Sequence, residues 1–231
     1  MNAHDVIVYP TASSLQPFHS SQLRYRQASA GDATVLAQLI YAAGEAEFAY
    51  FLGADSQTCI AFLQEALEEP LGHFSWHHHQ VATLADQPVA VMSIQDGRGS
   101  LLNGPYLAAQ LTRHFGWRQT GAILRRGLVL QREIPSPARD QTLIAHCATV
   151  PEMRGLGVFS ALFSHAMTCG QLPARKGQDI ILDVLASNTQ AFALYRRLGF
   201  VQMSTHPFVA AGVPEHLFAK RMRFRATPRS C

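Results

Sequence analysis

The stretch from residue 142 to residue 168 constrains the fold more than any other part of the sequence. Residues 142–150 form an apolar run of strand length, and an amphipathic helix pattern begins at Val158. The turn between them contains Gly155 and Gly157. A strand that passes through a glycine turn directly into a helix presents free backbone N–H groups at the positive end of the helix dipole, where an anion such as phosphate can bind. Ordinary tight turns also use paired glycines, and the turn is neither a P-loop nor a GxGxxG motif.

The periodicity of the remaining chain places this segment in a β-α-α-β-β-β-α-β-α-β-β order. Such an order is typical of an α/β protein with a mixed sheet. In chain order, the expected elements are a strand at 23–28, a helix at 33–43, a helical turn at 45–51, a helix from Ser56 to before Pro70, strands at 80–85 and 89–94, the strand at 142–150, a helix at 158–168, a strand at 179–185, a helix at 190–198, and strands at 200–203 and 216–224.

Residues 95–141 carry helical periodicity in two pieces, at about 106–115 and 120–131, separated by Gly116. The segment is too long for a loop and too short for a second domain, so we interpret it as a helical insertion. Its apolar residues can wall a binding pocket, form the surface of a homodimer, or simply pack against the domain; these include Tyr106, Phe115 and Trp117.

The insertion belongs to a single expected domain over residues 23–224. Residues 1–22 mix Ser, Pro, Gln and His without periodicity and are expected to be a loose extension, and residues 225–231 a tail. Apolar residues make up 48% of the chain, which is enough to bury a core and excludes disorder over most of the length. No apolar run approaches the roughly 20 residues of a membrane span, and the N-terminus lacks a signal-peptide pattern.

Cysteine and histidine usage predicts no metal site. The four cysteines form no CxxC pair, which favours a reducing, cytoplasmic location over a disulfide scaffold. His73 and His77 have the spacing of a helical metal pair, but no acidic or cysteine ligand accompanies them. We therefore interpret the histidines of residues 73–79 as part of an exposed, solvated loop.

Charge is divided unevenly along the chain, although the net charge is only +3. Residues 1–97 contain two basic and ten acidic residues, whereas residues 98–231 contain seventeen basic and six acidic ones, and nearly all the basic residues are Arg. An anionic partner is therefore expected to meet the second half. Biased genome composition could also explain the Arg excess. The run from Lys220 to Arg225 comes with no nucleic-acid-binding motif and is interpreted as a solvated strand face, so no nucleic-acid partner is expected.

Two linked motifs follow one another in the second half of the chain. The first is the run Thr149-Val150-Pro151-Glu152-Met153-Arg154-Gly155-Leu156-Gly157-Val158-Phe159, and the second is Asn188-x-x-Ala191-x-x-Leu194-Tyr195-x-x-x-Gly199-Phe200. With these motifs the sequence resembles the GNAT superfamily of acyl-CoA-dependent N-acetyltransferases, whose first motif reads Val-x-Pro-Glu-x-Arg-Gly-x-Gly-x-Gly/Ala and whose second follows at this separation. The resemblance covers about residues 23–224 and implies the GNAT fold, whose mostly antiparallel sheet splays between strands four and five.

The resemblance also implies acetyl-CoA as co-substrate and direct attack by the primary amine of a small molecule or peptide, within a ternary complex. The pantetheine arm would enter between strands 142–150 and 179–185, and a backbone N–H near its thioester would polarise the carbonyl. The residues expected to bind the cofactor are Cys147, Ala148, Thr149, Arg154, Gly155, Leu156, Gly157, Val158, Phe159 and Asn188. Asn188 is also a candidate helix N-cap.

Tyr195 is the first candidate catalytic residue, because a phenol can protonate the departing thiolate. Strand 142–150 carries no acid, so His146 is the candidate general base. Strand alternation lets at most one of His146 and Cys147 face the substrate. The resemblance implies that residues 143, 145 and 147 face it, and His146 is then a satisfied histidine in the sheet. Water that relays the proton to a backbone carbonyl is a rival. Glu45 and Glu47 are candidates to bind a cationic amine, and a solvated acidic turn is the alternative.

Three departures from the family pattern bear on the activity. Phe159 replaces the small residue that usually closes the pyrophosphate loop, Thr149 replaces an aliphatic residue, and Ala90 replaces a common glycine. None of these changes removes a backbone N–H donor. Phe159 and the absence of an acidic residue on strand 142–150 are nevertheless consistent with an alternative function, a non-catalytic protein that binds CoA or acyl-CoA as a sensor or structural element.

Overall fold

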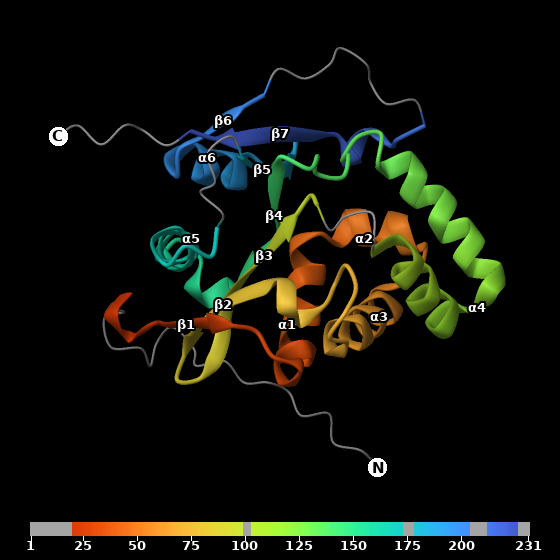
Figure 1. The fold of residues 1–231 in the computed structure, drawn as a ribbon, viewed down its shortest axis with the longest axis horizontal. Helices are drawn as coiled ribbons and strands as arrows, with labels where there is room; N and C mark the ends of the chain where they lie inside the picture. Colours follow the sequence, from red (N-terminus) through yellow and green to blue (C-terminus); the bar gives the residue numbers. More distant parts are fainter. Residues whose placement is uncertain (1–19, 99–102, 173–177, 204–211, 226–231) are drawn as a thin grey trace.

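A seven-stranded mixed sheet runs through the residues that the structure, a computed structural model, describes: 20–98, 103–172, 178–203 and 212–225 (Figure 1). The strand order is β1-β2-β3-β4-β5-β7-β6, and the one parallel pair, β4 with β5, lies among antiparallel neighbours. The predicted fold class is confirmed. The strands are β1 (Arg24–Gln27), β2 (His79–Leu84), β3 (Gln87–Asp96), β4 (Gln141–Thr149), β5 (Asp179–Leu185), β6 (Phe200–Gln202) and β7 (Ala219–Phe224).

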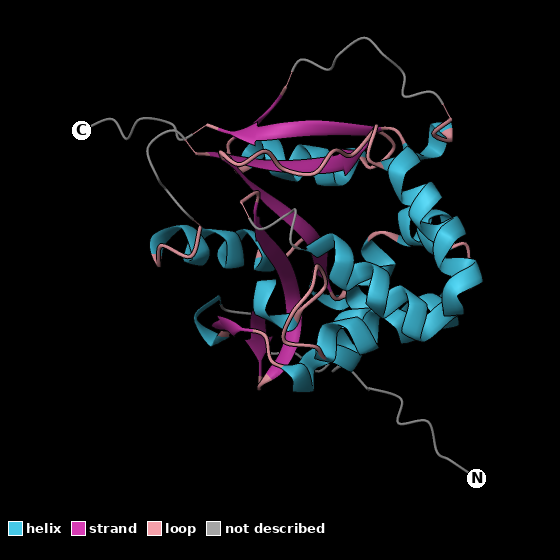
Figure 2. Cartoon of the chain, turned by 45° about the vertical axis from the view of Figure 1, so that its right-hand side comes forward, coloured by secondary structure: helices cyan, strands magenta, loops and turns pink. Residues whose placement is uncertain are grey.

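Helices cover both faces of the sheet (Figure 2). α1 packs against β3 and β4, whereas α5 packs against β2, β3 and β4 from the other side (Figure 1). Their buried faces carry the apolar residues at helical spacing that the sequence predicts. The helices are α1 (Ala33–Ala43), α2 (Glu45–Leu52), α3 (Ser56–Glu68), α4 (Asn103–Leu130), α5 (Val158–Thr168) and α6 (Thr189–Arg197).

The sheet opens between its two parallel strands. β4 and β5 pair only from Gln141↔Asp179 to Ile144↔Leu182. Beyond that point β4 continues on β3 as far as Thr149, while β5 continues on β7. The strands splay as predicted, and the edge of β4 that faces β5 has no strand partner after Ile144.

The predicted helical insertion is α4, and Gly116 divides it into two helices. Gly116 has φ 75° and ψ 160°, a conformation that interrupts the helix. The first half is held to α3 by the ion pair of Arg113 with Glu69 and by the contact of His114 with Glu65. The second half is held to α2, because Arg126 donates hydrogen bonds to the last carbonyls of that helix. The insertion therefore lies beside the α2 end of the domain.

Local differences from the predicted elements are small. Residues 216 and 217, expected to begin the last strand, belong instead to one turn of 3-10 helix (Glu215–Leu217) before β7. The helical turn expected at 45–51 is the full helix α2. The predicted N-terminal extension lies outside the described residues except for its last three, and residues 226–231 of the predicted tail lie outside them too.

Candidate active site

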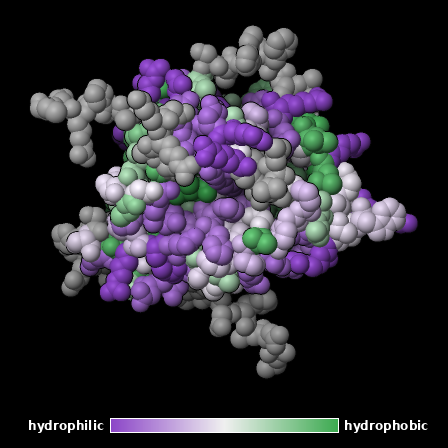
Figure 3. All heavy atoms as spheres, viewed as in Figure 1, coloured by the Kyte–Doolittle hydropathy of each residue, from purple (hydrophilic) through white to green (hydrophobic). Residues whose placement is uncertain are grey.

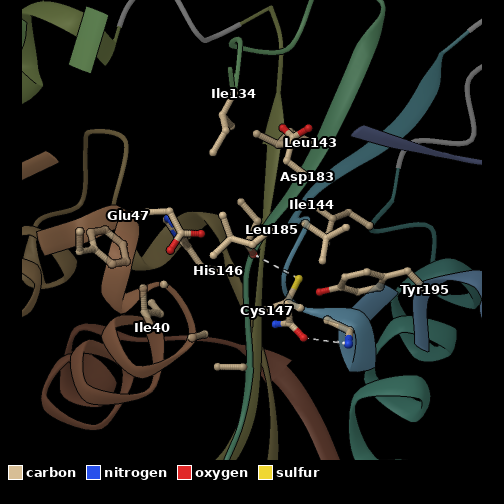
Figure 4. A pocket seen from close by; sticks show the side chains of 18 of the residues that line it. Ile40, Glu47, Ile134, Leu143, Ile144, His146, Cys147, Asp183, Leu185 and Tyr195 are labelled. Atoms are coloured by element: carbon tan, nitrogen blue, oxygen red, sulfur yellow. Dashed lines mark hydrogen bonds between the residues drawn. The ribbon is translucent and has the colours of Figure 1, made fainter. Parts of the chain in front are cut away.

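A cavity of about 1460 Å³ lies where β4 and β5 diverge. It is bounded by α1, α2 and α4 on one side of β4 and by α5, α6 and β5 on the other (Figure 4). Single small-ligand pockets are generally about 300–1000 Å³, so the cavity is large enough for two substrates. Among the candidate site residues, it is lined by Glu47, His146, Cys147, Ala148, Thr149, Arg154, Gly155, Gly157, Val158, Phe159, Asn188 and Tyr195. Glu45 and Leu156 are not among its lining residues.

The turn after β4 has the open backbone that an anion needs. Gly155 and Gly157 have φ values of 77° and 80°, in the left-handed region that favours glycine. A Cβ atom added at either glycine would meet no atom within 4 Å, so the space above the backbone is open. The first N–H groups of α5 have no acceptor within the helix and lie at its positive end. These features fit a pyrophosphate.

Phe159 does not fill this turn. Its side chain is 7% exposed, and its ring meets the edge of Tyr195 at a centroid distance of 6.1 Å. The bulky residue at the end of the family motif is thus accommodated by the core beneath α5, and it supports the Tyr195 ring.

Tyr195 and Cys147 meet at the cavity (Figure 4). Burial raises the pKa of the Tyr195 hydroxyl well above its usual range, and the neighbouring Cys147 raises it further. Burial also raises the pKa of the Cys147 thiol to about 12. Both groups are therefore protonated at neutral pH, so Tyr195 is able to donate a proton and Cys147 is not a thiolate.

A β-bulge places His146 on the cavity as well. The pairing of β3 with β4 shifts between Val91 and Ser93, so His146 and Cys147 together oppose the single residue Met92. His146 has φ 52°, a left-handed conformation that is uncommon for a residue with a side chain and that recurs at functional sites. His146 points to the Glu47 side of β4 and Cys147 toward Tyr195 (Figure 4).

Both side chains line the cavity, and they do so from opposite sides of β4 (Figure 4). The departure of β5 opens the cavity to both sides of the strand, and the expectation that at most one of the two residues faces the substrate stays a prediction.

Two hydrogen bonds define which nitrogen of His146 is free. Nδ1 of His79 lies 2.9 Å from the Ser75 carbonyl oxygen, which can only accept, so His79 donates there and its neutral ring has an unprotonated Nε2. That Nε2 lies 3.0 Å from Nδ1 of His146, which must be the donor. Neutral His146 therefore carries its proton on Nδ1, and its Nε2 has a free lone pair. Burial, with smaller contributions from His79 and His73, holds the pKa of His146 well below its usual value.

The interpretation of residues 73–79 as an exposed, solvated loop is wrong. His79 begins β2 and is fully buried, and His73 lines the cavity. Burial lowers the pKa of each to about 4. The ring of Phe74 stacks on His146 at a centroid distance of 5.4 Å. Among the described residues, no group of three or more His, Cys, Asp or Glu is arranged to bind a metal ion.

The buried histidines predict a loss of stability at mildly acidic pH. The pKa of His79 is lower in the folded chain than in the unfolded chain, so below about pH 6.5 the unfolded chain binds more protons. We expect the free energy of unfolding to fall between pH 6.5 and pH 4 by up to about 1.4 kcal/mol per pH unit from His79 alone. Urea unfolding at a series of pH values measures this slope. It should be shallower in His79→Gln and unchanged in His77→Gln, whose histidine is exposed; equal slopes in all three proteins would contradict the assignment.

The two candidate amine-binding acids differ in position. Glu47 lines the cavity and Glu45 is exposed outside it, although both belong to α2. The Oε2 atom of Glu47 is buried and has no hydrogen-bond partner among the described residues. Burial raises the pKa of this carboxyl group. The neighbouring His216 opposes this rise only in part. A buried carboxylate oxygen without a hydrogen-bond partner is unfavourable, and an approaching cation compensates it.

Asn188 caps α6, because its side-chain oxygen accepts a hydrogen bond of 3.0 Å from the N–H of Ala191.

The Arg-rich last strand, β7, differs from the solvated strand face that the sequence predicts. Arg221 is paired with Asp183 on β5 through bonds of 2.9 and 2.7 Å, and Arg223 contacts Asp179. These arginines join β7 to β5 instead of forming a free cationic surface.

Sequence reasoning missed several residues at the site. His79 and His73 lie next to His146, and the insertion contributes Leu107, Leu124 and Leu128 to the cavity wall. The cluster of histidines at residues 73–79 was a visible signal for His79 and His73. No local pattern, however, showed that His146, which lies 67 residues after His79, would contact this cluster. The cavity-wall role of the insertion was among the alternatives left open.

The fold and the cavity define an α/β protein with an open glycine turn beside two splayed strands. Residues 40–200 match the sequence profile described as the Acetyltransferase (GNAT) family. The match spans more than half of the chain, so the protein belongs to the GNAT family, as the two motifs predicted. No curated protein sequence matches the chain.

Solved structures agree on the fold. An N-acetyltransferase from Staphylococcus aureus Mu50 is similar with a TM-score of 0.64 and 14% identity, over 87% of this chain and 99% of that chain. A structure described as an acetyltransferase is similar with a TM-score of 0.61 and 16% identity, over 87% of this chain and 98% of that chain. Membership of this family supports acyltransferase activity.

Within the described residues, no helix has the length and apolarity needed to cross a membrane.

Proposed function

We propose that the protein transfers an acetyl group from acetyl-CoA to a primary amine of a small molecule or peptide, by direct attack in a ternary complex. The observation that carries the proposal is one cavity in which a protonated phenol, Tyr195, and an imidazole with a free Nε2, His146, lie on the two sides of the splayed strand β4. Family membership supports the acyl-transfer chemistry in general.

The chain offers two groups of binding atoms for the CoA substrate, which supplies the acetyl group as an activated thioester. The N–H groups from Arg154 to Phe159 suit the pyrophosphate, and the unpaired edge of β4 over Cys147, Ala148 and Thr149 suits an extended polar arm. A backbone group that the bulge releases from the strand ladder can polarise the thioester carbonyl. Asn188 lies at the other wall.

His146 and Tyr195 would carry the two proton transfers. Nε2 of His146 accepts a proton from the ammonium group, which has a pKa of about 10 in water and must become a free amine before it attacks. The C–N bond then forms, the C–S bond breaks, and Tyr195 Oη donates a proton to the departing sulfur. His146 passes the first proton to solvent, so that its Nε2 accepts the second proton of the nitrogen as the tetrahedral intermediate collapses, and the tyrosine regains its own proton from solvent.

A covalent acetyl-enzyme on Cys147 is disfavoured. The thiolate is the nucleophilic form of cysteine, and the pKa of about 12 keeps Cys147 in the thiol form at neutral pH. Direct transfer needs both substrates at once, and the volume of the cavity is consistent with that requirement.

Release of CoA, measured with acetyl-CoA and a panel of primary amines, tests this function. We expect turnover with at least one amine, initial-rate patterns of a ternary complex, and an N-acetylated product seen by mass spectrometry. Acetyl-CoA binding, measured separately by calorimetry, is the control. Tight binding of acetyl-CoA without turnover on any amine would contradict the enzyme and favour a CoA-binding sensor.

A further inference from the structure

The acceptor lobe is the part of the cavity on the α1–α4 side of β4, and its wall is largely apolar. It is lined by Ile40, Phe48, Phe51, Leu107, Leu124 and Leu128. Leu128 is 66% exposed and Leu124 is 37% exposed, so the insertion presents large apolar side chains that the protein itself leaves uncovered. On the visible face of the molecule, hydrophobic residues gather in small areas, one of them on the right, where Figure 1 draws α4 (Figure 3). Exposed apolar groups in a concave site favour an apolar ligand.

Negative charge in the cavity is limited to two carboxyl groups. Asp183 is engaged by the guanidinium of Arg221 through two hydrogen bonds, so its charge is already compensated. Glu47 has a buried Oε2 atom without a partner among the described residues. Glu47 is therefore the one cavity carboxylate, within the described part of the chain, that is available to an incoming cation.

We propose that the acceptor is a monoamine with an apolar alkyl or aryl body, whose ammonium group binds Glu47 and whose body packs on the insertion. This substrate class deepens the proposed acetyltransferase and rests on it. In Figure 4 the Glu47 carboxyl group lies on the His146 side of β4, so an ammonium group held by Glu47 lies on the side of the proposed base. The ammonium group also compensates the negative charge of the buried Glu47 carboxylate, whose burial is otherwise energetically unfavourable.

The same lobe disfavours polycations and peptides. A polyamine would bring further positive charges against Leu107, Leu124 and Leu128, where no second free carboxylate is available in the described cavity. A peptide would bury amide groups against the same apolar wall, and each unsatisfied amide is unfavourable. A monoamine carries one positive charge, which can pair with Glu47, and leaves no further charge against the apolar wall.

A matched panel of acceptors tests the substrate class. With saturating acetyl-CoA, we expect kcat/KM for n-hexylamine and 2-phenylethylamine to exceed that for ethanolamine, spermidine and Ala-Ala by about tenfold or more, as burial of several methylene groups predicts. Leu128→Ser should lower kcat/KM for n-hexylamine by a larger factor than kcat/KM for ethanolamine, and because the side chain is largely exposed the fold should be retained.

A pair of variants on one helix tests Glu47. Glu47→Gln removes the charge and keeps the shape, so we expect KM for n-hexylamine to rise about tenfold while KM for acetyl-CoA stays the same. Glu45→Gln, at the exposed position outside the cavity, is the control and should match the wild type. Equal effects of the two substitutions would overturn the assignment.

The outcomes separate this inference from the proposed function. Best turnover with spermidine or Ala-Ala would overturn the substrate class and leave the acetyltransferase standing. No turnover on any amine would overturn the acetyltransferase; calorimetric binding of n-hexylamine, weakened by Glu47→Gln, would still support the ligand class. Absence of both turnover and binding would overturn the inference.

Discussion

Replacement of Tyr195 by Phe is expected to lower kcat by about 100-fold to 10,000-fold, the range that general acid catalysis supplies. The substitution removes only the hydroxyl group, and the ring contacts with Phe159 and Phe200, both at 6.1 Å, remain. Because burial keeps the pKa of Tyr195 well above its usual range, the hydroxyl is protonated throughout the neutral and mildly basic range. The loss of rate should therefore be nearly independent of pH below about pH 9. CoA release with the best acceptor amine measures it.

Tyr41→Phe is the matched control, since Tyr41 is as buried as Tyr195, at 7% exposure, and does not line the cavity. It should leave kcat unchanged. Calorimetry should also find that acetyl-CoA binds Tyr195→Phe as tightly as the wild type. A kcat within threefold of the wild type in Tyr195→Phe would exclude the hydroxyl as the proton donor and direct attention to a water molecule in that role.

Local patterns predicted those parts of the fold that depend on local interactions. The break of α4 at Gly116 and the turn at Gly155 and Gly157 are visible in the sequence, because glycine is the residue that adopts a positive φ without strain. The divergence of β4 from β5 was expected from the family resemblance. The packing of α4 on α2 and α3 was not predicted, because Arg126 finds its carbonyl partners more than 70 residues earlier in the chain.

The site was predicted less completely, because its decisive feature is a non-local register shift. The family resemblance argued against His146, whereas the bulge in the pairing of β4 with β3 and the departure of β5, which opens the cavity on both sides of β4, depend on strand pairing that is not local. The partner of His146 was equally hidden, since His79 lies 67 residues earlier and its burial depends on the packing around it. Alternating arginines on the last strand resembled a solvated face for the same reason: Asp183, which pairs with Arg221, belongs to another strand.

Replacement of His146 by Gln is expected to lower kcat by about 100-fold at neutral pH, because the variant lacks the free Nε2 that accepts the ammonium proton. In the wild type, burial holds the pKa of His146 well below its usual value, so the base stays unprotonated and active to pH values below about 6.5. The deficit of the variant should shrink as pH approaches about 10, where the amine loses its proton to solvent. A pH profile of kcat for both proteins measures this convergence.

His79→Phe distinguishes a positioning effect from the loss of the base. The variant keeps the His146 imidazole and an aromatic ring beside it but removes the acceptor that holds its Nδ1 proton, so Nε2 is no longer the nitrogen that must be free. We expect a smaller loss than in His146→Gln, by about tenfold, since removal of a partner that orients a catalytic histidine usually costs 10- to 100-fold in comparable sites. His77→Gln, on the same segment but exposed, should retain full activity. If the rate deficit of His146→Gln stays constant from neutral pH to pH 10, His146 does not remove the ammonium proton, and a water relay to a backbone carbonyl becomes the base.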